Sequence, residues 1–266
     1  MTQTQKIIKY CAIALAVVLI VSIVSGIVGV IGYFAGFGEV KLLSEPQAHA
    51  LEGEIAALRI EISGSTLHVK SGDALSLESN ISDLSVKQSK QTLTVREPRR
   101  IFGNSAGGVV TLTLPQGASF SDVEITVGAG VLTLESMTAR ELSLELGAGR
   151  AEITGLTVTD ECSLESGTGS VIFKDCNLND AEFDLGVGKL EFSGILNGRS
   201  EFNCGVGNVD VRLTGVKDDY SLIASRGIGS ITVDGASVAD RQTVGTGGRR
   251  IEINGGVGTV NVTFAG

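Results

Sequence analysis

The stretch Glu145–Gly155, "ELGAGRAEITG", decides the fold because its pattern recurs along the second half of the chain. At its centre Gly147 and Gly149 flank one small residue, and a strand-like run lies on each side. The first glycines of the seven copies are Gly128, Gly147, Gly167, Gly186, Gly205, Gly227 and Gly256. They are 19, 20, 19, 19, 22 and 29 residues apart, and a period of this size indicates a repeat architecture.

Apolar residues recur at constant distances from the first glycine of each copy. The residues three positions before it are Ile125, Leu144, Leu164, Phe183, Phe202, Ala224 and Ile253. Apolar residues also stand four and six positions after it, with polar residues between them. This alternation indicates one short half-buried strand on each side of the glycines. A third apolar patch follows, as at Met137 and Ala139.

Three short sides per repeat predict one coil of a β-solenoid, whose stacked coils lie about 4.8 Å apart. We therefore predict an all-β fold with about seven coils of 19–20 residues over residues 121–266. Capping strands are expected over 58–120. A loop insertion over 236–250 is expected to precede a last coil, and a loop that breaks a repeat is the first place to look for function. Repeated Gly-x-Gly hairpins are the alternative, and they would give a meander or sandwich with antiparallel pairing.

Residues 10–38 contain no charged side chain, and about 20 apolar residues are enough for a helix to cross a bilayer. We predict a transmembrane helix there. Lys6 and Lys9 precede this run, so the positive-inside rule places residues 1–9 in the cytoplasm and the rest of the chain outside. Residues 39–57 are expected to be a linker.

A cleaved signal peptide is the alternative for this segment, with Ala48-His49-Ala50 as its small-x-small site. That site lies about ten residues beyond the apolar run, farther than in signal peptides, so we favour a retained anchor. Within the run, Gly32 and Gly36 form a GxxxG pair. Such a pair lets two membrane helices pack closely, which makes a homodimer through these glycines a further hypothesis.

The glycine motif predicts no cofactor or metal site. A phosphate-binding loop needs a following helix whose N-terminus holds the anion, whereas a strand follows each copy here. Calcium-binding corners carry an Asp two residues after the second glycine. This chain has at that position Leu132, Ala151, Val171, Leu190, Val209, Ile231 and Val260. Glu145, Glu165 and Asp184 share an outward column, where we expect solvated side chains; a weak cation site is the alternative.

No catalytic residues are predicted. The only histidines are His49 and His68, and neither lies in the repeats, so a Ser-His-Asp or Cys-His site cannot be built there. Cys162, Cys176 and Cys204 fall in different inward columns, so we predict three buried free thiols rather than a disulfide. The net charge of −9, with no basic stripe, argues against nucleic-acid binding.

The chain resembles the bacterial putative-adhesin family over roughly residues 55–266. The resemblance is carried by the apolar N-terminal anchor, by the lead-in "VVTLTLPQGASFSDVEITVGAG", and by the repeats "LELGAGRAEITGL" and "DLGVGKLEFSGIL". It implies a right-handed β-helical fold and a membrane-anchored or secreted protein of the bacterial cell envelope. It brings no agreed active site that could be transferred to this chain.

We therefore expect a non-enzymatic envelope protein with one membrane helix. Its extracytoplasmic β-solenoid would be a binding, adhesion or scaffolding surface for an envelope protein or a polysaccharide. One alternative is a regulatory partner of a membrane stress-sensing system, which would contact another membrane protein through its helix. The other is a β-helix polysaccharide-active enzyme, which would need a cleft with a desolvated pair of carboxylates.

Overall fold

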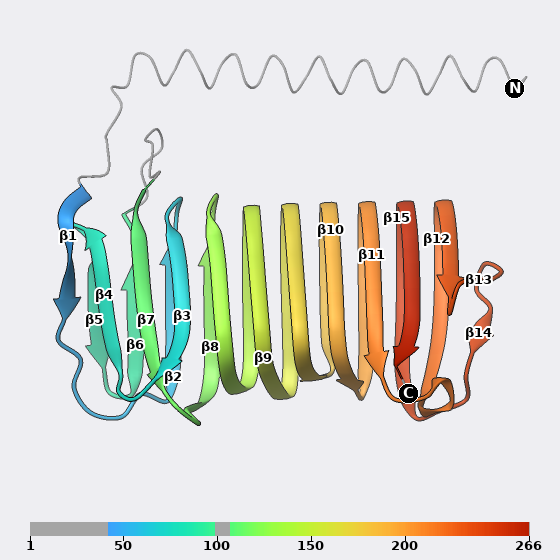
Figure 1. The fold of residues 1–266 in the computed structure, drawn as a ribbon, viewed down its shortest axis with the longest axis horizontal. Helices are drawn as coiled ribbons and strands as arrows, with labels where there is room; N and C mark the ends of the chain where they lie inside the picture. Colours follow the sequence, from blue (N-terminus) through green and yellow to red (C-terminus); the bar gives the residue numbers. More distant parts are fainter. Residues whose placement is uncertain (1–41, 99–106, 266) are drawn as a thin grey trace, which may run out of the picture. The chain divides into compact units, whose positions relative to one another are not determined.

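The computed structural model describes residues 42–98 and 107–265, which are almost entirely β-sheet (Figure 1). The all-β prediction is confirmed. The strands before the long repeats are β1 (Leu42–His49), β2 (Ala57–Ile62), β3 (Thr66–Gly72), β4 (Ser76–Ile81), β5 (Ser85–Ser89), β6 (Thr92–Arg96), β7 (Val109–Pro115) and β8 (Ser119–Val127). The long strands are β9 (Val131–Asn179), β10 (Ala181–Asn197), β11 (Arg199–Thr214), β12 (Tyr220–Val233) and β15 (Arg249–Ala265). Short elements near the end are η1 (Lys217–Asp219), β13 (Ala236–Ser237) and β14 (Thr243–Val244).

Neighbouring repeats pair in parallel, with equivalent residues opposite each other. In β9, β10 and β11, Leu164 lies opposite Phe183, and Phe183 lies opposite Phe202. The pairing continues through the glycines, where Gly169 lies opposite Gly188. Each repeat is therefore one level of a parallel stack, and the antiparallel pairing of repeated hairpins is not seen between these strands.

The corners of the stack require glycine because successive levels approach closely there. The amide of Ala148 donates to the carbonyl of Gly128 at 2.6 Å. A Cβ atom on Gly147 would lie 2.5 Å from that same carbonyl oxygen, which no side chain tolerates. The second glycine of the motif has a positive φ in the later levels, for example 151° at Gly188, a region that glycine adopts without strain.

The inward columns form a continuous apolar core. Phe173, Phe183, Phe192 and Phe202 are at most 2% exposed, and the rings of Phe183 and Phe202 stack with centroids 4.5 Å apart. Phe173 and Phe183 meet edge to face at 5.5 Å. The inward positions predicted for these side chains are confirmed, and each level fills the space between the side chains of its neighbours.

The last repeat does not lie at the end of the stack. Strand β15 pairs in parallel with β11 on one side and with β12 on the other, so it lies between two strands that precede it in sequence (Figure 1). This corrects the expected order, in which the coil after residue 250 comes last. The five residues between β11 and β12 can span up to about 17 Å, whereas alternate levels lie only about 10 Å apart, so the chain can step past one level.

The segment predicted as a loop over 236–250 is partly ordered as strand. Strands β13 and β14 pair antiparallel with β12, and β15 begins at Arg249. They cover parts of the outer edge of β12, which pairs with β15 on its other side. A strand edge left open exposes unpaired backbone groups, and this supplies a physical reason for the interruption of the repeat.

The N-terminal strands are also out of sequence order. Strand β2 pairs in parallel with β6 on one side and β8 on the other, while β4 pairs antiparallel with β7. The residues predicted as capping strands therefore include levels of the parallel stack. Strand β1 corrects the linker predicted over 39–57, because Leu42–His49 pairs antiparallel with β4. Its side chains are mostly exposed, so its sequence lacks the apolar alternation that identifies a strand.

No helix among the described residues is both long and apolar enough to cross a membrane. The membrane helix predicted over 10–38 and the Gly32–Gly36 pair lie outside the described residues.

Candidate functional site

A groove of about 1080 Å³ runs along one corner of the stack. It is lined by the first glycine of every repeat, so it crosses seven levels. Side chains cannot fill the space above these positions, because successive levels approach too closely for a Cβ atom. The same steric requirement that places glycine in the corner therefore leaves a continuous depression along it.

Among the described side chains, the floor of the groove is formed by residues that precede the first glycine of a repeat. Leu146, Leu185 and Cys204 line it and are largely buried, with exposed fractions of 5, 6 and 7%. Ser166 takes the equivalent position and is 8% exposed. Its hydroxyl forms no hydrogen bond within the described residues, so the groove is the side from which a partner can reach it.

One wall of the groove is a polar column that changes character along the stack. Its carboxylates are Glu145, Glu165 and Asp184, and its amides are Asn203 and Asn254. Asn203 Nδ2 donates to Asp184 Oδ1 at 2.8 Å, and Asn254 Nδ2 donates to Asn203 Oδ1 at 3.0 Å. Among the side chains that the structure describes, no Lys, Arg or His lines the groove. The column is therefore anionic over three levels and neutral over the next two.

The residue between the two glycines forms a second, apolar column beside the groove. Val187 lies opposite Val206, Val206 opposite Val257, and Val257 opposite Ile228. Their exposed fractions are 51, 46, 45 and 74%, in the order Val187, Val206, Val257 and Ile228. In earlier repeats the same position holds Ala129, Ala148 and Thr168. We call Val187, Val206, Val257 and Ile228 the aliphatic ridge.

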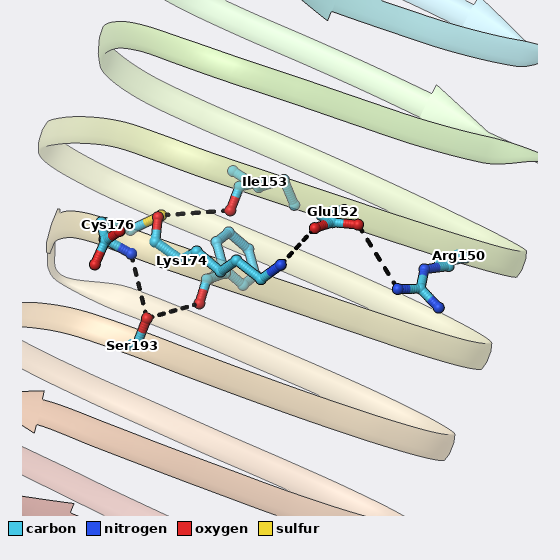
Figure 2. Close-up of polar contacts among 8 residues, drawn as sticks. Arg150, Glu152, Ile153, Lys174, Cys176 and Ser193 are labelled. Atoms are coloured by element: carbon cyan, nitrogen blue, oxygen red, sulfur yellow. Dashed lines mark hydrogen bonds and ion pairs between the residues drawn. The ribbon is translucent and has the colours of Figure 1, made fainter.

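The flat side beyond the corner carries compensated charges instead. Lys174 Nζ lies 2.5 Å from Glu152 Oε1, and Arg150 lies 3.6 Å from Glu152 Oε2. Figure 2 shows the two basic side chains on opposite sides of that carboxylate. The hydrogen bond and charge of Lys174 lower the pKa of Glu152. Lys189 pairs likewise with Glu191 at 2.6 Å. Because these acids have basic neighbours, they differ from the three carboxylates of the groove.

The predicted free thiols are confirmed, since Cys162, Cys176 and Cys204 are buried and unbridged. Burial raises the pKa of Cys162 to about 12 and that of Cys176 to about 11. Cys176 Sγ lies 3.2 Å from the carbonyl oxygen of Lys174 and 3.9 Å from that of Ile153 (Figure 2). With pKa values raised in this way, the thiols of Cys162 and Cys176 are protonated core side chains at neutral pH.

A second depression of about 570 Å³ is lined by acids that include Glu141, Glu161 and Glu182. Arg199 lines it too and pairs with Glu252 at 3.2 Å, and Arg140 pairs with Asp160, also at 3.2 Å. Within the described ranges no group of His, Cys, Asp and Glu side chains is placed to hold a metal ion. His68 is half-buried in β3.

The sequence pattern does not predict the groove. It predicts a corner at the glycine column and a stacked column of outward acids. The groove depends on how sharply the chain bends at each Gly-x-Gly corner, and the residue pattern does not predict that geometry. The residue between the two glycines becomes larger and more apolar from Ala129 to Ile228. This change is the one sequence signal that indicates a surface feature beside the corner.

No family model matches this chain. A protein of Treponema pallidum (strain Nichols), described as an uncharacterized lipoprotein, is 27% identical over 135 residues. The match covers 51% of this chain and 39% of that protein, so the chain spans well under half the length of this relative.

Among solved structures, a putative adhesin from Parabacteroides distasonis ATCC 8503 is similar with a TM-score of 0.46 and 11% identity, covering 86% of this chain and 100% of that one. A putative adhesin from Bacteroides fragilis NCTC 9343 gives 0.42 and 12%, covering 85% and 99%. A putative cell adhesion protein from Clostridium sporogenes ATCC 15579 gives 0.37 and 16%, covering 83% and 99%. These descriptions agree with the resemblance found in the sequence. Because the TM-scores lie below 0.5, we base the function on the chain's own residues.

Proposed function

We propose that this chain is a non-enzymatic, membrane-anchored protein of the bacterial cell envelope, and that its repeat domain binds another envelope protein. In this proposal the parallel levels are the coils of a right-handed β-solenoid, and the groove is the binding surface. The observation that carries the proposal is the pairing of that groove with the aliphatic ridge. Exposed apolar side chains that form a contiguous row are typical of an interaction site, whereas scattered ones are ordinary.

The composition of the groove favours a protein partner over a polysaccharide. Sugar-binding surfaces present exposed aromatic rings, which offer a flat apolar face and, in Tyr and Trp, a polar group. The described phenylalanines and tyrosine are buried, apart from the half-buried Phe264. The exposed large apolar side chains of the described residues are all Leu, Val or Ile. Aliphatic contacts of this kind suit protein side chains.

The membrane location rests on the N-terminal sequence. The uncharged run over 10–38, preceded by Lys6 and Lys9, supports a single-pass helix with residues 1–9 in the cytoplasm and the repeat domain outside. The Gly32–Gly36 pair supports a second candidate, in which the helix packs against another copy or against the membrane protein of a stress-sensing system. Cross-linking through residues 32 and 36 would separate this contact from one through the groove.

Site-specific photo-cross-linking in intact cells tests the proposed function. A photoreactive amino acid at Val206, on the aliphatic ridge, is expected to give a discrete cross-linked protein. The matched control places the same amino acid at Glu161, which is exposed in the other depression. Equal yields of the same products from both positions, or no product from Val206, would contradict a groove-centred binding function.

A further inference from the structure

We propose that the groove takes an extended peptide segment that has basic side chains at one end and aliphatic side chains at the other. This inference rests on the proposed function and names the chemistry of the partner. The basic end would face Glu145, Glu165 and Asp184, and the aliphatic end would lie along the ridge from Val187 to Ile228. The strand register defines the order of the levels. In that order the carboxylates come first and the ridge follows, so the two ends of the segment differ in chemistry.

The charge of the groove selects a cationic partner. Glu145, Glu165 and Asp184 line it, no basic side chain is among the described lining residues, and none of the three forms an ion pair within the described residues. Glu145 accepts a hydrogen bond from Thr126 at 3.3 Å and Asp184 accepts one from Asn203, so only neutral donors reach them. Like charges one level apart repel each other, and a row of Lys or Arg side chains would relieve that repulsion.

The hydroxyl of Ser166 is a polar contact point on the groove floor. Ser166 is 8% exposed as a residue, and its Oγ atom is not among the buried polar atoms without a partner, so it is open to the groove. Its hydroxyl forms no hydrogen bond within the described residues. It lies beside Glu165 at the middle of the anionic levels, where a backbone amide or carbonyl of a bound segment could pair with it.

The change from acids to amides and valines sets the direction of the segment. At the level of Asp184 the wall is still anionic and the ridge already begins with Val187. Beyond it, Asn203 and Asn254 are neutral while Val206, Val257 and Ile228 are exposed. A segment with its charges at the ridge end would desolvate them against valines without pairing them, which is costly.

The length of the groove bounds the length of the segment. Seven levels at about 4.8 Å spacing span roughly 29 Å. An extended peptide advances about 3.3 Å per residue, so about nine residues fill the groove. Membrane lipid fits poorly, because the carboxylates would repel anionic headgroups.

Fluorescence anisotropy with the full chain in nanodiscs tests this inference. The probe is a labelled nine-residue peptide with three lysines at one end and valines and leucines at the other. One control peptide has the same composition with lysines and aliphatic residues interleaved, and another carries glutamates in place of lysines. We expect the first peptide to bind at least tenfold more tightly than either control, and its binding to weaken as salt is raised.

Variants locate the site. Glu145→Gln with Glu165→Gln and Asp184→Asn should weaken binding of the first peptide at least about tenfold, since it removes three charges at contact distance. Val206→Ser with Ile228→Ser should weaken it without changing its salt dependence. The matched control is Glu141→Gln with Glu161→Gln and Glu182→Gln, which removes three charges from the other depression and should change binding less than twofold.

Several outcomes would overturn the inference. One is equal loss in the groove variant and in the control variant; another is equal binding of the interleaved peptide. Binding of phosphatidylglycerol vesicles in place of the peptide would assign the groove to lipid. If Val206 cross-links an envelope protein in cells while the peptide fails to bind, this inference fails and the proposed function stands.

Discussion

Gly186 shows what the corner of a level demands from a single residue. Its position admits no Cβ atom, because that atom would lie 2.5 Å from the carbonyl oxygen of Gly167 in the preceding level. The added Cβ atom would be bonded to the backbone of one paired strand, and the carbonyl oxygen belongs to the backbone of its neighbour. Neither atom can move away without disrupting the pairing of the two strands. The glycine of the motif is therefore selected by the approach of two backbones rather than by a ligand.

Gly186→Ala is expected to lower the free energy of unfolding by about 2 to 3 kcal/mol, the usual range for overpacking in a closely packed site. Gly248→Ala is the matched control, because a Cβ atom there has no neighbour within 4 Å, and it should change stability by less than about 0.5 kcal/mol. Urea unfolding of both variants measures the difference. Equal midpoints would refute the close-approach explanation.

Glu97 is the residue that sequence reasoning missed. Its side chain is buried at 3% exposure, and its Oε2 accepts the backbone amides of Ser63, Gly64 and Ser65 at 2.8, 3.2 and 3.4 Å. Its Oε1 accepts the hydroxyl of Ser65 at 2.9 Å. Ser63 and Ser65 lie where later levels carry the two glycines, and Glu97 supplies acceptors that a preceding level would otherwise provide.

Glu97→Ala is expected to lower the free energy of unfolding by about 3 kcal/mol, because it leaves several buried donors without an acceptor. Glu97→Gln keeps one carbonyl oxygen and should cost less. Glu135 is an exposed acid, so Glu135→Ala is the control and should be neutral. Thermal unfolding followed by circular dichroism orders the three variants, and a neutral Glu97→Ala would contradict the role of this carboxylate.

At the scale of elements, β15 holds the C-terminal levels together. It pairs with β11 along one edge and with β12 along the other, so both strands lose their neighbour when it is absent. It also contributes Asn254 and Val257 to the groove and its ridge. The element that completes this part of the stack thus follows β12 in the sequence.

A chain ending at Gly248 is expected to lose amide protection throughout β12 and along β11, while the level pairs within β9 and β10 stay protected. Hydrogen exchange with mass spectrometry measures protection by segment. A synthetic peptide covering residues 249–265 should restore protection of β12 when added to the truncated chain. Unchanged protection of β12 in the truncated chain would show that β15 does not hold this region.

At the scale of the whole molecule, buried thiols make the fold sensitive to alkali. Burial raises the pKa of Cys162 to about 12 and that of Cys176 to about 11, against a reference near 9. At a pH between the reference pKa and the raised pKa, each of these thiols is ionised in the unfolded chain and protonated in the native protein. The stabilisation is therefore complete below about pH 9 and is lost as the pH rises toward 12.

Stability measured by urea unfolding should fall between pH 9 and pH 11 more steeply in the wild-type chain than in Cys162→Ala. The difference at pH 11 is expected to be on the order of 2 kcal/mol, since each unit between the two pKa values corresponds to about 1.4 kcal/mol. In native protein at pH 8, Cys162 and Cys176 should react with a thiol reagent only after denaturant is added. Rapid native reaction of Cys162 would contradict its burial.

The pattern of the repeats determined the period, the two strands around each glycine pair, and which side chains point inward. Phe183 and Phe202 could be placed in one column because a β-strand alternates its faces and a repeat returns each face at the same offset. The free thiols followed from the same columns. The period, the strands and the inward positions depend on residues close together in the sequence, so the spacing of apolar residues and glycines predicts them directly.

The order of the levels, the groove and the role of Glu97 were decided only by the tertiary structure. The repeat spacings of 22 and 29 residues marked a break near β12, but a break in spacing does not say which edge a later strand occupies. Insertion of β15 between β11 and β12 gives it a paired neighbour on both edges, which no position at the end of the stack provides. Such pairing depends on which backbone edges meet in space. A residue pattern describes side chains only, so it does not predict which edges pair.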